Sequence, residues 1–183
     1  KHNGMKFVLA GKPFYGEDIQ SLYHTIMQGI MPSKNQGILK KQDIRQQYTN
    51  VLQAAYKPKK SIGVAWDAGN GAAGEIMEML CKTLPGDHIA LNAVIDGRFP
   101  IHHPDPSVAE NLYQLVDEVK KNKLDIGIAF DGDGDRVGVI DDEGVIIWPD
   151  QLMMLYAQEV LGKYPGATII ADVKASQALF DRV

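Results

Sequence analysis

Leu124-Asp125-Ile126-Gly127-Ile128-Ala129-Phe130 runs directly into Asp131-Gly132-Asp133-Gly134-Asp135-Arg136. The first segment is an almost continuous apolar run, which is typical of a strand that is buried on both faces of a sheet. The second segment places three carboxylates at alternate positions, with only glycine between them. A buried strand that ends in such a loop predicts an α/β domain with a ligand site at the carboxyl end of the strand.

The acidic loop destabilises a fold unless a cation neutralises it, because like charges a few ångströms apart raise one another's pKa. Its two glycines can take positive φ and let the carboxylates converge on one point. Three converging hard oxygens suit Mg²⁺, which keeps its other positions for water and phosphate. We therefore expect Asp131, Asp133 and Asp135 to bind Mg²⁺, with Arg136 beside them as a partner for a phosphate oxygen.

Two other structures could account for the acidic loop. An EF-hand loop also begins D-x-D-x-D, but its sixth and twelfth positions should be Gly and Glu, where this sequence has Arg136 and Asp142. The apolar runs 124–130 and 137–140 predict strands on both sides, whereas an EF-hand loop joins helices. The second alternative is a solvated acidic turn, since Asp-Gly is a common turn dipeptide. The complete motif after a buried strand favours the metal site.

Strands and helices alternate on both sides of this segment. The apolar pattern predicts further strands at 62–66, 88–93 and 168–171, and helices at 73–81, 108–119, 150–161 and from about 176. A short hairpin is expected at 142–144. This order predicts parallel pairing with right-handed crossovers, and hence a three-layer α/β/α domain with a mainly parallel mixed sheet.

The first third of the chain has a different pattern. It contains a strand-like run at 7–10, an amphipathic helix from Glu17, a polar loop at 31–42 and a second amphipathic helix at 44–55. Lys57-Pro58-Lys59-Lys60 is the candidate hinge. We predict two domains, residues 1–58 as the C-terminal part of a preceding similar α/β domain and residues 59–183 as the metal-binding domain.

Composition narrows the possible partners. The chain has 183 residues and a net charge of −4, without a Lys/Arg-rich tract, so we expect no nucleic-acid partner. No apolar run approaches the roughly 20 residues that span a bilayer, so we expect no membrane association. The single cysteine, Cys81, lies on the apolar face of a predicted helix. A buried, reduced thiol predicts a cytoplasmic protein.

The turn from Asp67 to Gly74 offers an alternative function. Gly69, Gly71 and Gly74 form G-x-G-x-x-G between a predicted strand and a predicted helix, which is the context of a dinucleotide-binding fingerprint. However, Asp67 would place negative charge beside a pyrophosphate, and no acidic residue ends the second strand. We favour the interpretation that these small residues let the helix pack tightly on the sheet.

The loop 96–106 contains two aspartates and the adjacent histidines His102 and His103. Zinc is one interpretation, but the ligand set is incomplete, and adjacent side chains on an extended chain point to opposite sides. Three prolines in the loop indicate a rigid connection. We favour a structural role.

Several segments occur together in the order seen in α-D-phosphohexomutases. They are Asn3-Gly4-Met5-Lys6, residues 67–71, 96–100, 104–106 and 130–136, and Asp172-Val173-Lys174. The chain most resembles the bacterial phosphomannomutase/phosphoglucomutase branch, and the resemblance covers essentially its whole length. It implies an isomerase that interconverts hexose 1-phosphate and hexose 6-phosphate, of mannose or glucose, through a phosphoserine and a hexose 1,6-bisphosphate.

The resemblance also implies roles for individual residues. The three aspartates of the acidic loop would hold Mg²⁺ together with a phosphoserine oxygen, and Arg136 would lie close to the phosphoryl group. Lys6 would serve at the transfer centre, and Lys174 would contact the substrate. Hexose 1,6-bisphosphate would activate the parent enzyme.

The family's Ser-His-Asn-Pro loop does not occur in the chain, which begins with Lys1 inside the gap that follows it. We therefore expect an inactive fragment, whose partners are the missing domains of the same parent chain and a hexose phosphate. Two alternatives remain, a dinucleotide-binding domain that uses Gly69, Gly71 and Gly74, and a non-enzymatic module that binds a divalent cation.

Overall fold

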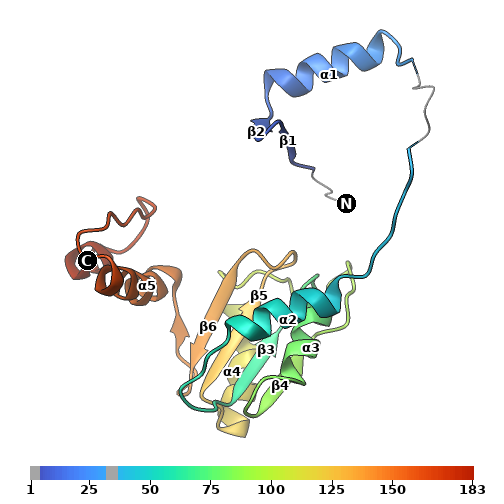
Figure 1. Cartoon of the computed structure of the whole chain (residues 1–183). Helices are drawn as coiled ribbons and strands as arrows, with labels where there is room; N and C mark the ends of the chain where they lie inside the picture. The colour runs from blue at the N-terminus through green and yellow to red at the C-terminus, as the bar shows by residue number, and fades with distance from the viewer. Residues whose placement is uncertain (1–4, 32–36) are drawn as a thin grey trace. The chain divides into compact units, whose positions relative to one another are not determined.

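The structure, a computed structural model, describes residues 5–31 and 37–183 and forms two compact units, Lys1–Gln42 and Asp43–Val183 (Figure 1). The first unit contains strands β1 (Phe7–Leu9) and β2 (Lys12–Phe14) and helix α1 (Glu17–Met27). β1 and β2 pair antiparallel. The strand at 7–10 and the helix from Glu17 were predicted, but β2 was not, because it contains Pro13, which is tolerated in an edge strand.

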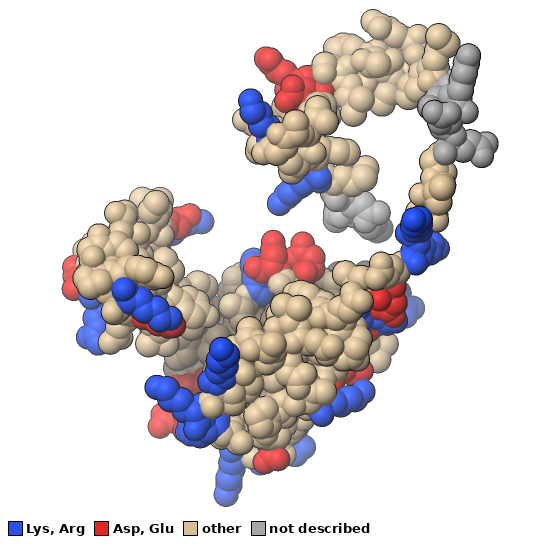
Figure 2. Space-filling model, in the orientation of Figure 1, with Lys and Arg blue, Asp and Glu red and all other residues tan. Residues whose placement is uncertain are grey.

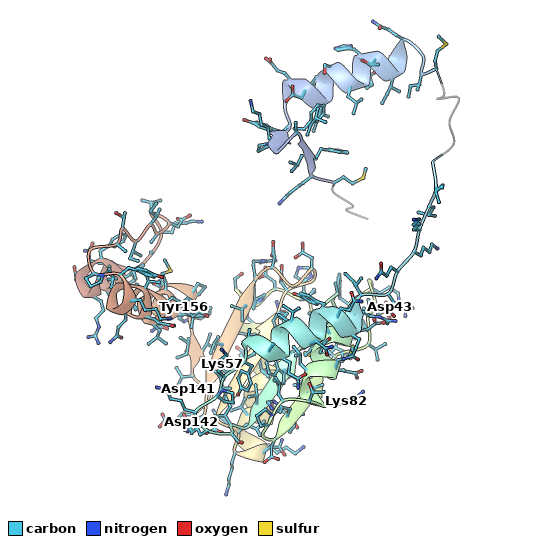
Figure 3. All side chains as sticks on the ribbon, viewed as in Figure 1. Asp43, Lys57, Lys82, Asp141, Asp142 and Tyr156 are labelled. Carbon is cyan, nitrogen blue, oxygen red and sulfur yellow. The ribbon has the colours of Figure 1, made fainter. Side chains whose placement is uncertain are left out.

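Helix α2 (Arg45–Ala55) packs on helix α3 (Gly74–Cys81) in the second unit. Arg45 Nη1 lies 2.6 Å from Glu75 Oε2, and the fully buried Thr49 donates its hydroxyl to Met79 Sδ. The two compact units divide before α2, which runs between the labelled residues Asp43 and Lys57 in Figure 3. The segment 57–60 joins α2 to β3, the first strand of the large sheet, and the domain boundary expected after residue 58 stays a prediction.

The second unit is built on a five-stranded mixed sheet in the order β4-β3-β5-β6-β7. Its strands are β3 (Val64–Asp67), β4 (His88–Leu91), β5 (Ile126–Phe130), β6 (Val137–Asp141) and β7 (Ile146–Ile147). β3 pairs parallel with β4 and β5, whereas β6 pairs antiparallel with β5 and β7. Helices α2 and α3 cover one face and helix α4 (Tyr113–Asn122) covers the other, which confirms the predicted α/β/α fold (Figure 1).

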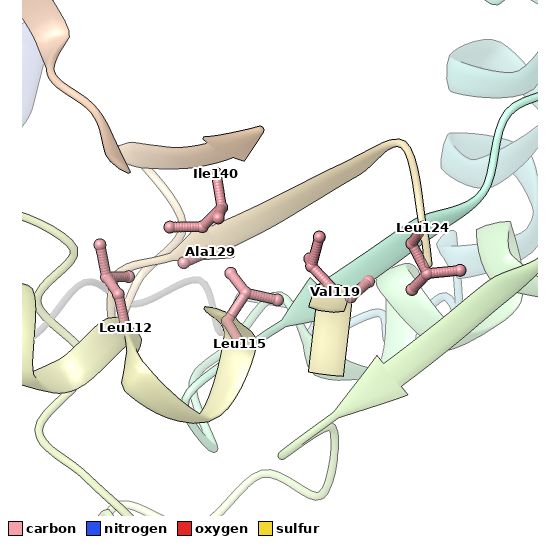
Figure 4. Packing of buried hydrophobic residues seen from close by; sticks show 7 residues of the cluster. Leu112, Leu115, Val119, Leu124, Ala129 and Ile140 are labelled. Atoms are coloured by element: carbon pink, nitrogen blue, oxygen red, sulfur yellow. The ribbon is translucent and has the colours of Figure 1, made fainter. Parts of the chain in front are cut away.

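The main core lies between α4 and the sheet. Leu115 and Val119 of α4 are fully buried against Ile140 of β6, in a cluster that Figure 4 shows from close by. Gly127 of β5 lets the helix approach, because a Cβ there would lie 2.9 Å from Val119 Cγ2. Burying one leucine side chain contributes about 2 kcal/mol. The apolar character of β5 is thus explained by its packing against α4.

The predicted helix at 108–119 begins as a 3₁₀ turn, η1 (Ala109–Leu112), before α4. The C-terminal region contains α5 (Pro149–Lys163) and α6 (Gln177–Arg182). Ser176 caps α6, its Oγ accepting a hydrogen bond from the amide of Ala178.

The predicted strand at 168–171 is wrong, since this segment pairs with no strand within residues 5–31 and 37–183, and Ile170 is 84% exposed. An apolar run needs a neighbouring strand to satisfy its backbone. Over the described ranges, no helix combines the length and the apolar character needed to cross a membrane.

Candidate functional site

The acidic loop joins the carboxyl end of β5 to β6, whose antiparallel register aligns Phe130 with Val137. The amide of Gly134 donates to the carbonyl of Asp131 at 3.1 Å and closes the turn. Gly134 has a φ of 77°, a conformation that a residue with a Cβ adopts only with strain. The sequence correctly predicted a loop here, but only one of its two glycines uses positive φ.

The three aspartates of the loop converge as predicted. Asp131, Asp133 and Asp135 each offer a carboxylate oxygen, and these oxygens lie within 4.8 Å of one another. Asp131 is buried, whereas Asp133 and Asp135 are exposed. Figure 2 shows acidic side chains gathered above the loop between β5 and β6. Within the described part of the chain, this is the group of His, Cys, Asp and Glu side chains arranged closely enough to hold a metal ion.

Arg136 fixes the buried member of this cluster. Its amide donates to Asp131 Oδ1 at 3.0 Å and its Nε donates to Oδ2 at 2.9 Å. Burial raises the pKa of Asp131, but these hydrogen bonds and the guanidinium charge outweigh burial and hold the pKa below its usual value. Asp131 is thus a carboxylate with a fixed orientation at neutral pH.

Arg136 is also held from a second direction. Its Nη1 donates to Asp105 Oδ1 at 2.9 Å, across 31 positions of sequence. Asp105 in turn accepts hydrogen bonds from the hydroxyl and the amide of Ser107, which hold its pKa below the usual range. The contact between Arg136 and Asp105 was not predicted from the sequence, where the only sign of it is an acidic residue in the proline-rich loop.

The exposed part of the cluster is electrostatically unfavourable by itself. The charges of Asp133 and Asp131 raise the pKa of Asp135, and Arg136 offsets this only in part, with Nε 3.8 Å from Asp135 Oδ1. A divalent cation among these oxygens would remove the repulsion. The donor set consists of hard carboxylate oxygens, so these residues fit Mg²⁺.

The turn 67–74 packs against the acidic loop. Ala72 donates its amide to the carbonyl of Gly132 at 2.9 Å, and a Cβ at Gly71 would lie 2.8 Å from that same oxygen. A Cβ at Gly74 would overlap the carbonyl of Ala93. These contacts support the packing interpretation of the glycines. In a dinucleotide-binding fingerprint, the backbone at the position of Gly71 lies close to the pyrophosphate. Here the backbone of Gly132 occupies the space beside Gly71.

The loop 96–106 contacts β3 through one of its two histidines, and its structural role stays a prediction. His103 is exposed, whereas His102 is largely buried and its Nε2 lies 2.9 Å from Asp67 Oδ2. The adjacent histidines thus differ in surroundings, and they do not group with the loop's aspartates into a metal site among the described residues. Sequence spacing gave no sign of the pair with Asp67, because its members are 35 positions apart.

The two lysines lie elsewhere in the chain. Lys6 is exposed and precedes β1 in the first unit. Lys174 lines a cavity of about 600 Å³ with Asp150, Met153 and Leu179, and the lining does not include the acidic loop. Among the described residues of the second unit, the lining of this cavity therefore does not join Lys174 to the aspartates.

A second cavity lies beside Arg136. It has a volume of about 400 Å³ and is lined by residues that include Ser107, Arg136, Trp148 and Tyr156. This volume lies within the usual range for small-molecule sites. Its position next to the guanidinium places space for a ligand close to the acidic loop.

Comparison with known proteins gives a consistent result. Residues 43–144 match the family described as phosphoglucomutase/phosphomannomutase, alpha/beta/alpha domain II. A phosphomannomutase/phosphoglucomutase of Pseudomonas putida is 44% identical over 97% of this chain, and a phosphoglucomutase of Neisseria gonorrhoeae is 42% identical over 97%. The chain spans 38% and 39% of the lengths of these two relatives.

A solved structure agrees with these relatives. A phosphoglucomutase/phosphomannomutase family protein of Burkholderia thailandensis superposes with a TM-score of 0.84 at 41% identity, over 97% of this chain and 38% of that one. The region matched to the family contains strands β3 to β6 of the sheet and the acidic loop. The chain belongs to the phosphoglucomutase/phosphomannomutase family.

Proposed function

We propose that this chain is part of a Mg²⁺-dependent phosphohexomutase that interconverts hexose 1-phosphate and hexose 6-phosphate. The observation that carries the proposal is the convergence of three aspartates and Arg136 at the carboxyl end of β5 in a chain of this family. The relatives' names include both phosphomannomutase and phosphoglucomutase. Mannose and glucose phosphates are therefore the proposed substrates.

The proposed reaction is an intramolecular exchange through a phosphoserine. The serine O–P bond breaks as the phosphoryl group joins the free hydroxyl of the hexose phosphate, and the proton of that hydroxyl passes to the serine oxygen. The hexose 1,6-bisphosphate then reorients and returns its other phosphoryl group to the serine, so the bisphosphate would also act as an activator. Since the chain spans about 38% of its relatives, we propose that other domains of the parent supply the serine.

Asp131, Asp133 and Asp135 are the proposed ligands of Mg²⁺, which when bound would neutralise charge on the phosphoryl oxygens. Asp131 offers an oriented carboxylate because Arg136 holds both of its oxygens. Asp133 and Asp135 are exposed, so they can adjust their position to the ligand. The site thus combines one carboxylate held by hydrogen bonds and two exposed carboxylates.

Arg136 is the proposed phosphoryl-binding residue of this region. Its contacts within the described residues use Nε and Nη1, and its side chain is 54% exposed. The guanidinium can therefore donate further hydrogen bonds to a phosphoryl oxygen. Lys6 is proposed to stabilise charge or move a proton at the transfer centre, and Lys174 to contact the substrate.

A cation titration tests the metal site. We expect Asp133→Asn to weaken Mg²⁺ binding by roughly tenfold or more, because a neutral amide replaces an anionic ligand. Asp142→Asn is the matched control, since Asp142 is exposed beside Asp141 at the far end of β6 (Figure 3). Isothermal titration calorimetry measures the affinity, and thermal melts check that both variants stay folded. Equal weakening by both substitutions would contradict a specific site.

An activity assay separates the mutase from the alternatives. In the full-length parent enzyme, we expect Asp133→Asn to abolish most mutase turnover in a coupled assay with hexose 1,6-bisphosphate, while Asp142→Asn keeps it. The 183-residue chain alone should show no sustained turnover. Mg²⁺ binding without any mutase activity in the parent would leave a non-enzymatic cation-binding module as the better account.

A further inference from the structure

Two carboxylates from different segments hold the guanidinium of Arg136. Its Nε donates to Oδ2 of Asp131 in the acidic loop at 2.9 Å, and its Nη1 donates to Oδ1 of Asp105 in the loop 96–106, also at 2.9 Å. The two carboxylates bind different nitrogens, so together they fix both the position of the planar group and its rotation. Among the described residues, the hydrogen bonds and ion pairs of Arg136 leave Nη2 unused.

Asp105 is itself held, so its carboxylate has a fixed orientation. Its Oδ1 accepts hydrogen bonds from the hydroxyl of Ser107 at 2.7 Å and from the amide of Ser107 at 3.0 Å. Its carbonyl oxygen accepts a hydrogen bond from the side-chain amide of Asn111 at 2.9 Å. The hydrogen bonds from Ser107 stabilise the ionised form and hold the pKa of Asp105 below its usual value. A charged, oriented oxygen therefore faces Arg136 at neutral pH.

Two buried prolines, Pro104 and Pro106, fix the backbone on either side of this carboxylate. Pro104 Cγ lies 3.4 Å from the position that a Cβ would take at Gly132 in the acidic loop. Pro106 Cβ lies 2.7 Å from the position that a Cβ would take at Gly138 in β6. Proline has a fixed φ, which limits how the chain between these two contacts can move. The carboxylate is therefore presented to the arginine by a segment that packs on both the acidic loop and β6.

Asp105 would affect a phosphoryl ligand of Arg136 in two opposite ways. Its negative charge lies 2.9 Å from Nη1 and reduces the attraction of the guanidinium for an anion. Its hydrogen bond removes rotational freedom that a long arginine side chain would otherwise lose when a ligand binds. A site that only attracts phosphate gains nothing from this carboxylate, whereas a site that aligns a phosphoryl group during transfer gains a fixed donor.

We propose that Asp105 is a positioning residue for phosphoryl transfer. Held by Ser107, it fixes the guanidinium of Arg136 so that Nη2 stays available to donate to the phosphoryl group as that group moves between the serine and the hexose. This role needs an acceptor oxygen at position 105, and it requires no change of protonation. The inference rests on the proposed function, since it assigns Asp105 to the same reaction.

Nitrogen-15 NMR of the 183-residue chain tests whether Asp105 holds the arginine. We expect the Nη1 hydrogens of Arg136 to exchange with water roughly tenfold faster in Asp105→Ala than in the wild type, because a charge-assisted hydrogen bond is lost. Asp96→Ala is the matched control, since Asp96 pairs with the exposed Arg98 in the same loop. Equal exchange in Asp105→Ala and the wild type would overturn the proposal.

Steady-state kinetics of the full-length parent enzyme tests the role in transfer. We expect Asp105→Ala to lower kcat roughly tenfold with a much smaller change in KM, because the arginine keeps its charge but is no longer aligned. Asp105→Asn keeps an acceptor oxygen for Arg136 and should restore most of the turnover. A role through charge alone predicts the same lowered KM for both variants, and that outcome would refute the positioning role.

A double-mutant cycle shows whether Asp105 acts through the arginine. Arg136→Lys keeps a positive charge but removes the planar group, so we expect Asp105→Ala to lower kcat no further in that background. A merely structural role of Asp105 would lower the melting temperature and leave the two effects on kcat additive. Additive effects would therefore contradict the proposal.

Ser107→Ala tests the same contacts if Asp105→Ala does not fold. It removes one hydrogen bond to Asp105 and leaves the carboxylate in place, so we expect kcat to fall roughly threefold, and not at all in the Arg136→Lys background. An unchanged kcat in folded Ser107→Ala would then refute the inference. An active parent without these effects contradicts this inference alone, whereas an inactive wild-type parent contradicts the proposed function, and the inference falls with it.

Discussion

Helices α1 and α4 show how similar sequence patterns can have different surroundings. Both carry apolar residues at helical spacing, but α1 has no buried residue, whereas α4 buries Leu115 and Val119. Leu22 of α1 is 42% exposed. Of the described residues of the first unit, Phe14 is the one that is even partly buried. Periodicity thus predicts which face of a helix is apolar, but not whether that face is covered.

The largest expected effect is a loss in the free energy of unfolding, which should differ between substitutions in α4 and in α1. Leu115→Ala should lower the free energy of unfolding of the second unit by about 3 kcal/mol, because it removes a fully buried side chain and leaves a cavity. Leu22→Ala should change it by less than about 0.5 kcal/mol. Urea unfolding followed by tryptophan fluorescence measures both, since both tryptophans, Trp66 and Trp148, lie in the second unit. Similar losses in the two variants would mean that α1 belongs to the same cooperative unit.

Thiol labelling sharpens the comparison at single positions. Burial raises the pKa of Cys81 to about 11, so little thiolate is available near neutral pH. A cysteine placed at exposed position 21 of α1, by Ser21→Cys in a Cys81→Ser background, should react with iodoacetamide roughly a hundredfold faster than Cys81. Unfolding both proteins in urea should remove the difference. Rapid labelling of Cys81 in the folded chain would show that α3 opens readily.

The smallest effect is expected on the surface of the second unit. Lys163 lowers the pKa of Glu159 through an i,i+4 hydrogen bond, but both side chains are 64% exposed and screened by water. The pair is therefore present above the ordinary pKa of glutamate and is lost as pH falls through the lowered value. Glu159→Gln should lower the melting temperature slightly at neutral pH, and this effect should disappear once the pH has fallen below the lowered pKa of Glu159. A large shift would show that ionic contacts on α5 matter more than its solvent exposure suggests.

The elements predicted best from the sequence are those that local pattern determines. β5 and the acidic loop are adjacent in sequence, so the apolar run and the D-G-D-G-D motif sufficed to place them. The strand expected at 168–171 failed because a strand depends on a partner that lies elsewhere in the chain. The packing of α2 on α3 could not be predicted from local pattern, because the contacting residues are about 30 positions apart.

The candidate site shows the same distinction. The three aspartates and Arg136 were predicted from one continuous motif, and the structure brings their side chains together. The contact of Asp105 with Arg136 and the His102–Asp67 pair were not predicted, because both form only through the fold. Lys6 and Lys174 were assigned from the family alone, and their roles stay predictions.

The division of the acidic loop into one buried and two exposed carboxylates has a consequence for how such sequences diverge. Asp131 and Arg136 hold the end of β5 and the start of β6 together, so selection for a folded chain alone would retain them. Asp133 and Asp135 make no comparable contact with the rest of the fold among the described residues. In a descendant that had lost its chemistry but kept its shape, these two positions would drift first, and their identity would mark which relatives still act as enzymes.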